Sequence, residues 1–111
     1  LIYAADSAYE LCQEQQTLYW REDDLLSLLK HLVSEYQCYE VLVEAGASVA
    51  GSFLNQRLVD ELVVYQAPCV LGSQARAMVE VNPLSLAQQL RFQYTESKLF
   101  GSNLKLTLQP L

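Results

Sequence analysis

The stretch "VLVEAGASVAGSFL", from Val41 to Leu54, decides how this chain folds. Its first three residues are apolar, and a continuous apolar run is typical of a strand covered on both faces, so we expect Val41–Val43 to form a strand. Glu44 ends that strand, and small residues follow it directly. Residues 46–56 then predict a short helix. The side chains expected to face inward from that helix are Val49, Phe53 and Leu54.

A longer helix is predicted before this stretch, across residues 21–37. Asp23 and Asp24 are N-cap candidates for it and suit the positive end of the helix dipole. After the stretch, Val59–Pro68 predict another strand. This order of helix, strand, helix and strand predicts an α/β fold with a mixed or parallel sheet and helices on its faces. The apolar residues that recur on one face of the longer helix are Leu25, Leu28, Leu29, Leu32 and Val33.

Further strands are predicted near both ends of the chain. Leu1–Ala4 is apolar, and Thr17–Trp20 is rich in β-branched and aromatic residues, so each predicts a short strand. Apolar and polar residues alternate across 90–95 and again across 104–108, which predicts an antiparallel pair with one face in water. The expected connections are 5–16, with one turn of helix, 68–85 and 96–103.

Composition and charge exclude several classes of protein. The chain has 111 residues, of which 51% are hydrophobic and 18% charged, and these values are typical of one folded domain. No apolar run approaches the ~20 residues of a membrane span. The net charge is −6 and the seven basic residues are scattered, so neither nucleic acid nor a membrane is an expected partner.

The cysteines and the single histidine predict no metal site. Cys12, Cys38 and Cys69 are too few and too widely spaced for a disulfide framework or a zinc pattern. We expect Cys38 and Cys69 to be reduced residues of the core, which favours a cytoplasmic location. His31 has no ligand partner at metal-binding spacing, so a solvated helix position is expected for it.

The residues that follow Glu44 have the properties of a phosphate cradle. The first N–H groups of a helix have no partner inside it, and the helix dipole is positive there, so an anion can bind if no side chain blocks it. Gly46, Ala47 and Ser48 are small enough to leave that approach open, and Gly51 would let the helix pack closely on the sheet or on a ligand. Taken alone, this pattern favours a structural turn over a phosphate site, because it is neither GxGxxG nor a P-loop. Glu44 could equally cap the helix, lie in solvent or face a substrate.

The longer stretch "VLVEAGASVAGSFLNQRLVDELVVYQAPCVLGSQAR" resembles the reductase domain of the bifunctional riboflavin-biosynthesis deaminase/reductase family, RibD. The order and the spacing of the family's motifs agree across about thirty-five residues. Those motifs are Val43-Glu44-Ala45-Gly46, Phe53-Leu54, Leu58-Val59-Asp60-Glu61-Leu62, Ala67-Pro68 and Leu71-Gly72.

The resemblance implies a fold, a reaction and a set of site residues. The fold is similar to dihydrofolate reductase, with a mixed sheet flanked by helices. The reaction is the NADPH-dependent reduction of a phosphoribosylamino-pyrimidine at its ribose C1′ to a ribitylamino product, a step of riboflavin biosynthesis. By the same resemblance, Glu44 contacts the pyrimidine substrate. The residues implied to bind NADPH are Gly46, Ala47, Ser48, Val49, Ala50, Gly51 and Ser52.

The chain also departs from the family pattern. Ala45 stands where Gly is usual, and Ala disfavours positive φ, although some relatives carry the same Ala. Residues 1–111 resemble only the C-terminal half or so of the reductase domain, so we expect the chain to be part of a larger protein. The catalytic residues are then expected upstream of Leu1, and zinc is expected only in a separate deaminase domain. Because such a partial domain would expose sheet edges, a homodimer is the expected assembly.

Two other functions stay open from the sequence. The chain could be a non-catalytic α/β module that mediates dimerisation through an exposed sheet edge, with purely structural glycines. It could also be a dihydrofolate-reductase-like reductase that acts on another pterin-like substrate.

Overall fold

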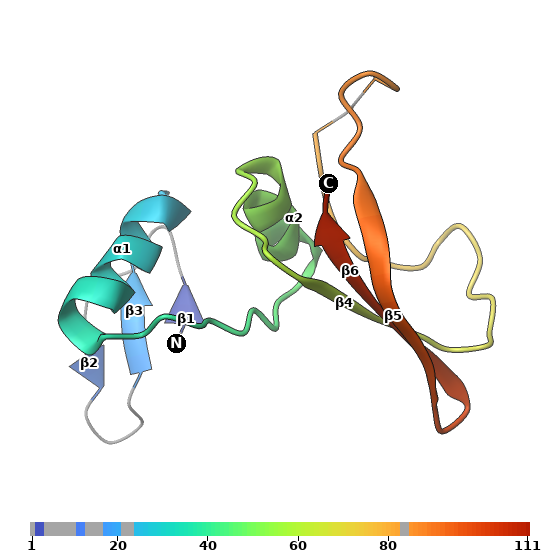
Figure 1. The fold of residues 1–111 in the computed structure, drawn as a ribbon, viewed down its shortest axis with the longest axis horizontal. Coiled ribbons are helices and arrows are strands. Elements are labelled where there is room, and N and C mark those ends of the chain that lie inside the picture. Colours follow the sequence, from blue (N-terminus) through green and yellow to red (C-terminus); the bar gives the residue numbers. More distant parts are fainter. Residues whose placement is uncertain (1, 4–10, 13–16, 21–23, 83–84) are drawn as a thin grey trace. The chain divides into compact units, whose positions relative to one another are not determined.

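The computed structural model of the protein describes residues 2–3, 11–12, 17–20, 24–82 and 85–111. They fall into two compact units, residues 1–42 and 43–111 (Figure 1). The elements of the first unit are β1 (Ile2–Tyr3), β2 (Leu11–Cys12), β3 (Thr17–Trp20) and α1 (Leu25–Tyr36). Those of the second unit are α2 (Ala47–Asn55), β4 (Leu62–Gln66), β5 (Phe92–Phe100) and β6 (Asn103–Pro110).

In the first unit, β3 is the central strand of a small mixed sheet. Strand β1 pairs with it in parallel and β2 in antiparallel fashion. The strands predicted across 1–4 and 17–20 are therefore confirmed where the structure describes them. The connection expected across 5–16 is wrong at Leu11–Cys12, which pair with β3 instead, because paired backbone groups stabilise even a two-residue strand. The rest of that connection lies outside the described residues.

Helix α1 confirms the predicted N-cap and three of the five residues predicted for its apolar face, but it begins at Leu25. Asp24 is the N-cap, and its carboxylate accepts a hydrogen bond from the N–H of Leu26 at 3.0 Å. The Ser27 hydroxyl donates to the same carboxylate at 2.6 Å. Against the expectation of a solvated histidine, His31 is half-buried, with its ring centroid 5.0 Å from that of Trp20. Leu25, Leu28 and Leu32 are buried, whereas Leu29 is half-buried and Val33 is exposed.

The strand predicted at Val41–Val43 is wrong. These residues belong to no strand, and Leu42 is 83% exposed. The boundary between the two units falls within this segment, after Leu42. A strand requires a neighbour to pair its backbone groups, and no described strand pairs with this segment. The apolar run therefore forms an irregular connection here, and Glu44 does not end a strand.

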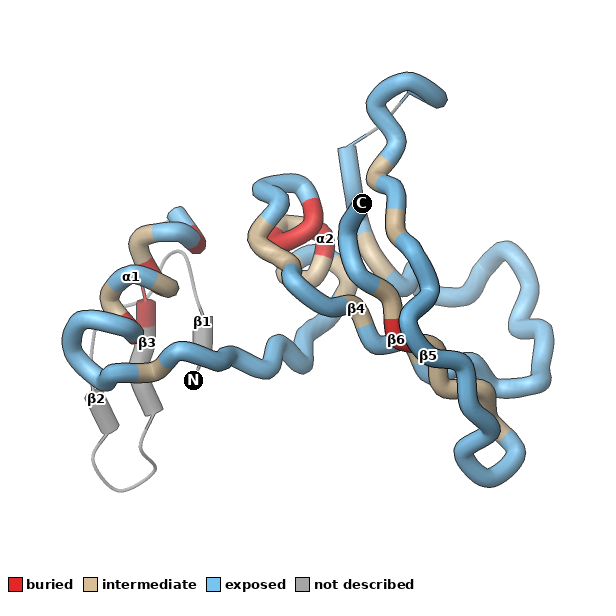
Figure 2. Tube along the Cα trace, in the orientation of Figure 1, coloured by how far each residue is buried: buried red, intermediate tan, exposed pale blue. Residues whose placement is uncertain are grey.

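The second unit has one helix, α2, and a three-stranded sheet among its described residues. Helix α2 is the helix predicted across 46–56, with Phe53 and Leu54 buried and Val49 half-buried. The strand order is β4-β6-β5, and both pairings are antiparallel. Figure 2 shows that buried residues gather in α2 and at one position of β6. The predicted strand after α2 is confirmed as β4, and the expected connection after it is irregular in its described part.

The hairpin of β5 and β6 is longer than the alternation predicted. The loop expected across 96–103 is wrong, because the strands continue until Phe100 faces Asn103. A two-residue turn joins them, and Gly101 (φ 63°) supplies the positive φ that such a tight turn needs. The ladder has an irregularity between Tyr94 and Glu96, which leaves Thr95 as the extra residue of a bulge.

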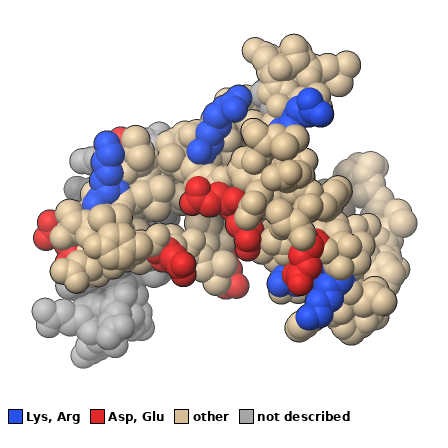
Figure 3. Space-filling view, in the orientation of Figure 1, with Lys and Arg blue, Asp and Glu red and all other residues tan. Residues whose placement is uncertain are grey.

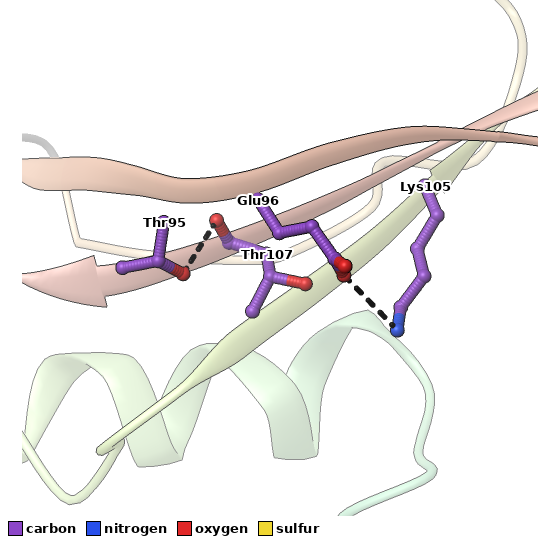
Figure 4. A network of polar contacts seen from close by, with 4 residues as sticks. All are labelled: Thr95, Glu96, Lys105 and Thr107. Atoms are coloured by element: carbon purple, nitrogen blue, oxygen red, sulfur yellow. Dashed lines mark hydrogen bonds and ion pairs between the residues drawn. The ribbon is translucent and has the colours of Figure 1, made fainter.

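Not all residues on the polar face of this hairpin are exposed to solvent. Thr107 is only 7% exposed, although alternation places it opposite the leucines of β6. Figure 4 shows the Thr95 hydroxyl, which donates to the Thr107 carbonyl oxygen at 3.2 Å. On the same strands, Lys105 and Glu96 form an ion pair at 3.7 Å. Thr107 is therefore part of the core although it is polar, because tertiary packing buries it. The alternation of apolar and polar residues does not predict such packing.

Two described cysteines differ in their surroundings. Cys38 is half-buried and Cys69 is exposed, and both are free thiols. The expectation of a core position is wrong for Cys69, because it follows Pro68 in the irregular segment after β4 rather than a packed element.

Candidate functional site

The N-terminus of α2 is open to an approaching anion. Gly46 is the N-cap, with φ −69° and ψ 171°, and no side chain caps the helix. Its carbonyl oxygen accepts the first helical bond, from the N–H of Ala50 at 3.1 Å. The N–H groups of Ala47, Ser48 and Val49 donate to no residue that the structure describes. A Cβ placed on Gly46 would meet nothing within 4 Å, so the space beside the N-cap is open.

Glu44 lies two residues before Gly46, the N-cap of this helix, and its side chain is exposed. Its carboxylate makes neither a hydrogen bond nor an ion pair with any of the described residues. It therefore does not cap α2, which was one of the readings that the sequence left open. The carboxylate is available to a ligand that approaches the same end of the helix.

Gly51 serves a different purpose in this structure, because the backbone of Glu80 occupies the space beside it. Gly51 is buried, and a Cβ there would collide with the Glu80 carbonyl oxygen and lie 2.6 Å from the carbonyl carbon. We call residues 80–82 the strap. The strap is held to α2 at both ends, by Glu80 N–H donating to the Ala47 carbonyl (2.9 Å) and Asn82 N–H donating to Asn55 Oδ1 (3.2 Å).

The strap is a contact that sequence reasoning missed. The sequence suggested that Gly51 allows close packing on the sheet or on a ligand, but it did not identify the partner. Gly51 and Glu80 are far apart in the chain, and no local pattern links them. The only signal was the glycine itself, because glycine within a helix costs stability and therefore suggests a packing reason for its presence.

The remaining candidate residues lie along the body of α2. Ser48 is exposed, whereas Val49, Ala50 and Ser52 are half-buried. The Ser52 hydroxyl donates to the Ser48 carbonyl at 3.0 Å, so it is already engaged within the helix. The structure thus brings the start of α2 and Glu44 to one exposed end, while Gly51 and Ser52 make contacts inside the protein. The roles of all these residues toward a cofactor stay predictions.

Other kinds of site find no support in the described part of the chain. There, no group of three or more His, Cys, Asp or Glu side chains could hold a metal ion. None of its helices is both long enough and apolar enough to cross a membrane. Figure 3 shows both basic and acidic side chains among the described residues.

These elements define an α/β domain whose short helix begins with uncapped, accessible N–H groups. The sequence profile of the RibD C-terminal domain family matches residues 2–106 of the chain. The chain therefore belongs to the RibD C-terminal domain family. This finding confirms the resemblance drawn from the sequence.

Curated relatives extend the comparison. The chain is 36% identical over 97 residues to the riboflavin biosynthesis protein RibD of Haemophilus influenzae, which covers 86% of this chain and 26% of that protein. It is 40% identical over 86 residues to RibD of Escherichia coli, covering 77% of this chain and 23% of that protein. A protein of Buchnera aphidicola named 5-amino-6-(5-phosphoribosylamino)uracil reductase is 33% identical over 88 residues, covering 78% of this chain and 42% of that protein. The chain thus spans from about a quarter to less than half of these relatives.

A solved structure confirms the fold class. RibD of Acinetobacter baumannii matches with a TM-score of 0.80 and 37% identity, covering 88% of this chain and 28% of that one. The α/β class, the flanking helices and the terminal antiparallel pair predicted from the sequence are therefore confirmed.

Proposed function

We propose that this chain is part of an NADPH-dependent 5-amino-6-(5-phosphoribosylamino)uracil reductase of riboflavin biosynthesis. The observation that carries the proposal is the start of α2, where three N–H groups have no acceptor among the described residues, no side chain caps the helix and the space beside Gly46 is open. Membership of the RibD C-terminal domain family and the name of the Buchnera relative support it.

In this proposal the N–H groups of Ala47, Ser48 and Val49 bind a phosphate of the dinucleotide at the positive end of α2. Gly46 keeps the approach open. When bound, NADPH supplies the hydride that reduces the ribose C1′ of the substrate. Glu44, exposed beside this helix start, accepts hydrogen bonds from the pyrimidine and orients it.

The strap holds α2, and with it the proposed cofactor site, in position. Because Glu80 bonds the first residue of α2 and Asn82 bonds the side chain of its last residue, the helix cannot slide along its axis without breaking these bonds. Residues that perform the chemistry are proposed to lie outside the chain, and a homodimer in the cytoplasm is the proposed state of the whole protein.

Blocking the approach to α2 tests the cofactor site. In the full-length protein that carries this chain, we expect Gly46→Val to weaken NADPH binding by about tenfold or more, because lost hydrogen bonds to a charged group have effects of this size. Isothermal titration calorimetry measures the dissociation constant, and circular dichroism checks that the fold is retained. An unchanged dissociation constant in a folded variant would falsify the cradle.

Neutralising Glu44 tests the substrate contact. Glu44→Gln keeps the shape of the side chain but removes its charge, so we expect the KM for the pyrimidine substrate to rise by about tenfold while the KM for NADPH stays near its original value. Glu40→Gln is a matched control, since Glu40 is also exposed and precedes the same helix. If both substitutions change the KM for the pyrimidine equally, or if neither changes it, Glu44 does not contact the substrate and is simply exposed to solvent.

A non-catalytic dimerisation module remains a second candidate, because β5 exposes apolar side chains. Tyr94, Leu99 and Phe100 are 70%, 74% and 60% exposed on this outer strand of the sheet. If the chain is such a module, it should self-associate, and Gly46→Val should leave NADPH binding unchanged. If the chain is part of the reductase, Gly46→Val should weaken NADPH binding.

A further inference from the structure

A hollow of about 230 Å³ lies at the end of α2 opposite to the proposed cofactor cradle. Helix α2 has 9 residues, so the two ends are about 12 Å apart along its axis at 1.5 Å per residue. The C-terminal end of the helix, the start of β5 and the end of β6 form its walls. The residues that line it are Leu54, Arg57, Val59, Gln89, Leu90, Arg91, Phe92, Pro110 and Leu111.

The charge of this hollow contrasts with that of the chain. Arg57 and Arg91 both line it, and no acidic residue does, although the chain as a whole has a net charge of −6. Neither guanidinium forms an ion pair with any carboxylate in the described ranges. The other side chains that line it are apolar except for that of Gln89. The hollow therefore combines two unpaired cations with an apolar surface.

The backbone of Arg57 is held in a defined conformation at the end of α2. Arg57 has φ 56°, in the left-handed region where glycine is the usual residue just after a helix. This conformation closes α2 through bonds from Arg57 N–H to the Leu54 carbonyl and from Leu58 N–H to the Phe53 carbonyl, both 3.0 Å. Gln37 has the same left-handed conformation (φ 52°) at the end of α1, so both helices end in this way, and at α2 it fixes the position from which the Arg57 side chain starts.

We propose that this hollow binds a small carboxylate with a compact apolar body. A cavity of about 150 Å³ is enough to hold benzene, so this volume accommodates a body of that size together with a carboxylate. The forked guanidinium groups match the two oxygens of a carboxylate, and Leu54, Leu90 and Phe92 cover the apolar part. The site does not depend on the proposed reductase function.

Three probes test the ligand class in the full-length protein by isothermal titration calorimetry. Phenylacetate carries both features, phenylacetamide has the same shape without charge, and inorganic phosphate has charge without the apolar body. We expect phenylacetate to bind at one site per chain, and each of the other two to bind about tenfold more weakly or worse. Absence of phenylacetate binding, or equal binding of either other probe, overturns the proposal.

Two variants place the binding in the hollow. Arg91→Gln and Arg57→Gly should each weaken phenylacetate binding by about tenfold. Without ligand, Arg57→Gly should also leave the melting temperature unchanged or raise it, since glycine relieves the left-handed strain. Arg76→Gln is the matched control, because Arg76 is exposed and does not line the hollow, and it should bind phenylacetate normally. Normal binding by both pocket variants, or an equal loss in the control, overturns the assignment.

Discussion

Gly46, the N-cap of α2, and Gly51, five residues later within the helix, serve opposite purposes. Space beside Gly46 is empty, so the absence of a side chain keeps donors accessible to a ligand. Space beside Gly51 is filled by the Glu80 backbone, so the absence of a side chain lets the strap pack against the helix. The same residue type thus contributes to an open site at one position and to packing at the other.

Substituting each glycine separates these purposes. We expect Gly51→Ala to lower the free energy of unfolding by about 1–3 kcal/mol, because the new methyl group forces the strap backbone to move. Gly46→Ala, the matched control, should cost less than about 1 kcal/mol, since it meets no atom and only weakens an N-cap. Urea denaturation measures both values, and equal losses in the two variants would contradict this account of Gly51.

At the scale of the element, α1 depends on a capped first turn. The pKa of Asp24 lies below its ordinary value, chiefly because the Ser27 hydroxyl donates to the carboxylate and further because the Leu26 N–H does so. A carboxylate with a lowered pKa stabilises the folded state above its unfolded pKa, and this contribution disappears as the pH falls through the lowered value.

The pH dependence of unfolding tests this cap. We expect the stability contributed by Asp24 to be lost on acidification below about pH 4. Asp24→Asn should remove this part of the pH dependence while it keeps a capping oxygen, and Asp24→Ala should destabilise α1 at neutral pH as well. Thermal unfolding followed by circular dichroism across this pH range measures the effect. If Asp24→Asn loses stability on acidification in the same way as the original protein, the Asp24 carboxylate is not the source of this pH dependence.

At the scale of the whole molecule, the second unit exposes an outer strand. Strands β4 and β5 lie at the two edges of the described sheet, and β5 exposes several large apolar side chains. Exposed strand edges and apolar patches favour association with another chain. This exposure supports the proposed dimer.

Light scattering over a range of concentrations tests the association. We expect the mass of the chain to rise with concentration toward that of a dimer. Leu99→Lys should shift the rise to higher concentration because a charge on the outer strand opposes pairing. Leu86→Lys is the matched control, since Leu86 is 87% exposed but outside β5, and it should leave the rise in place. A monomer at every concentration would exclude the dimer proposed for this chain.

The sequence by itself determined the local features of this protein. Helical spacing and Asp24 predicted α1, alternation predicted the β5–β6 pair, and the small residues after Glu44 predicted a short helix there. These features depend on the periodicity and backbone preference of neighbouring residues, which a short stretch of sequence encodes. The family motifs across 41–76 identified the family for the same reason.

The contacts between surfaces depend on tertiary packing. Val41–Val43 has the composition of a buried strand but lacks a described strand to pair with. Gly51 meets Glu80, and Thr107 is buried, because segments distant in sequence pack there. Arg57 and Arg91 share one hollow for the same reason. Long-range packing depends on the relative positions of whole elements, and no local pattern of residues specifies those positions.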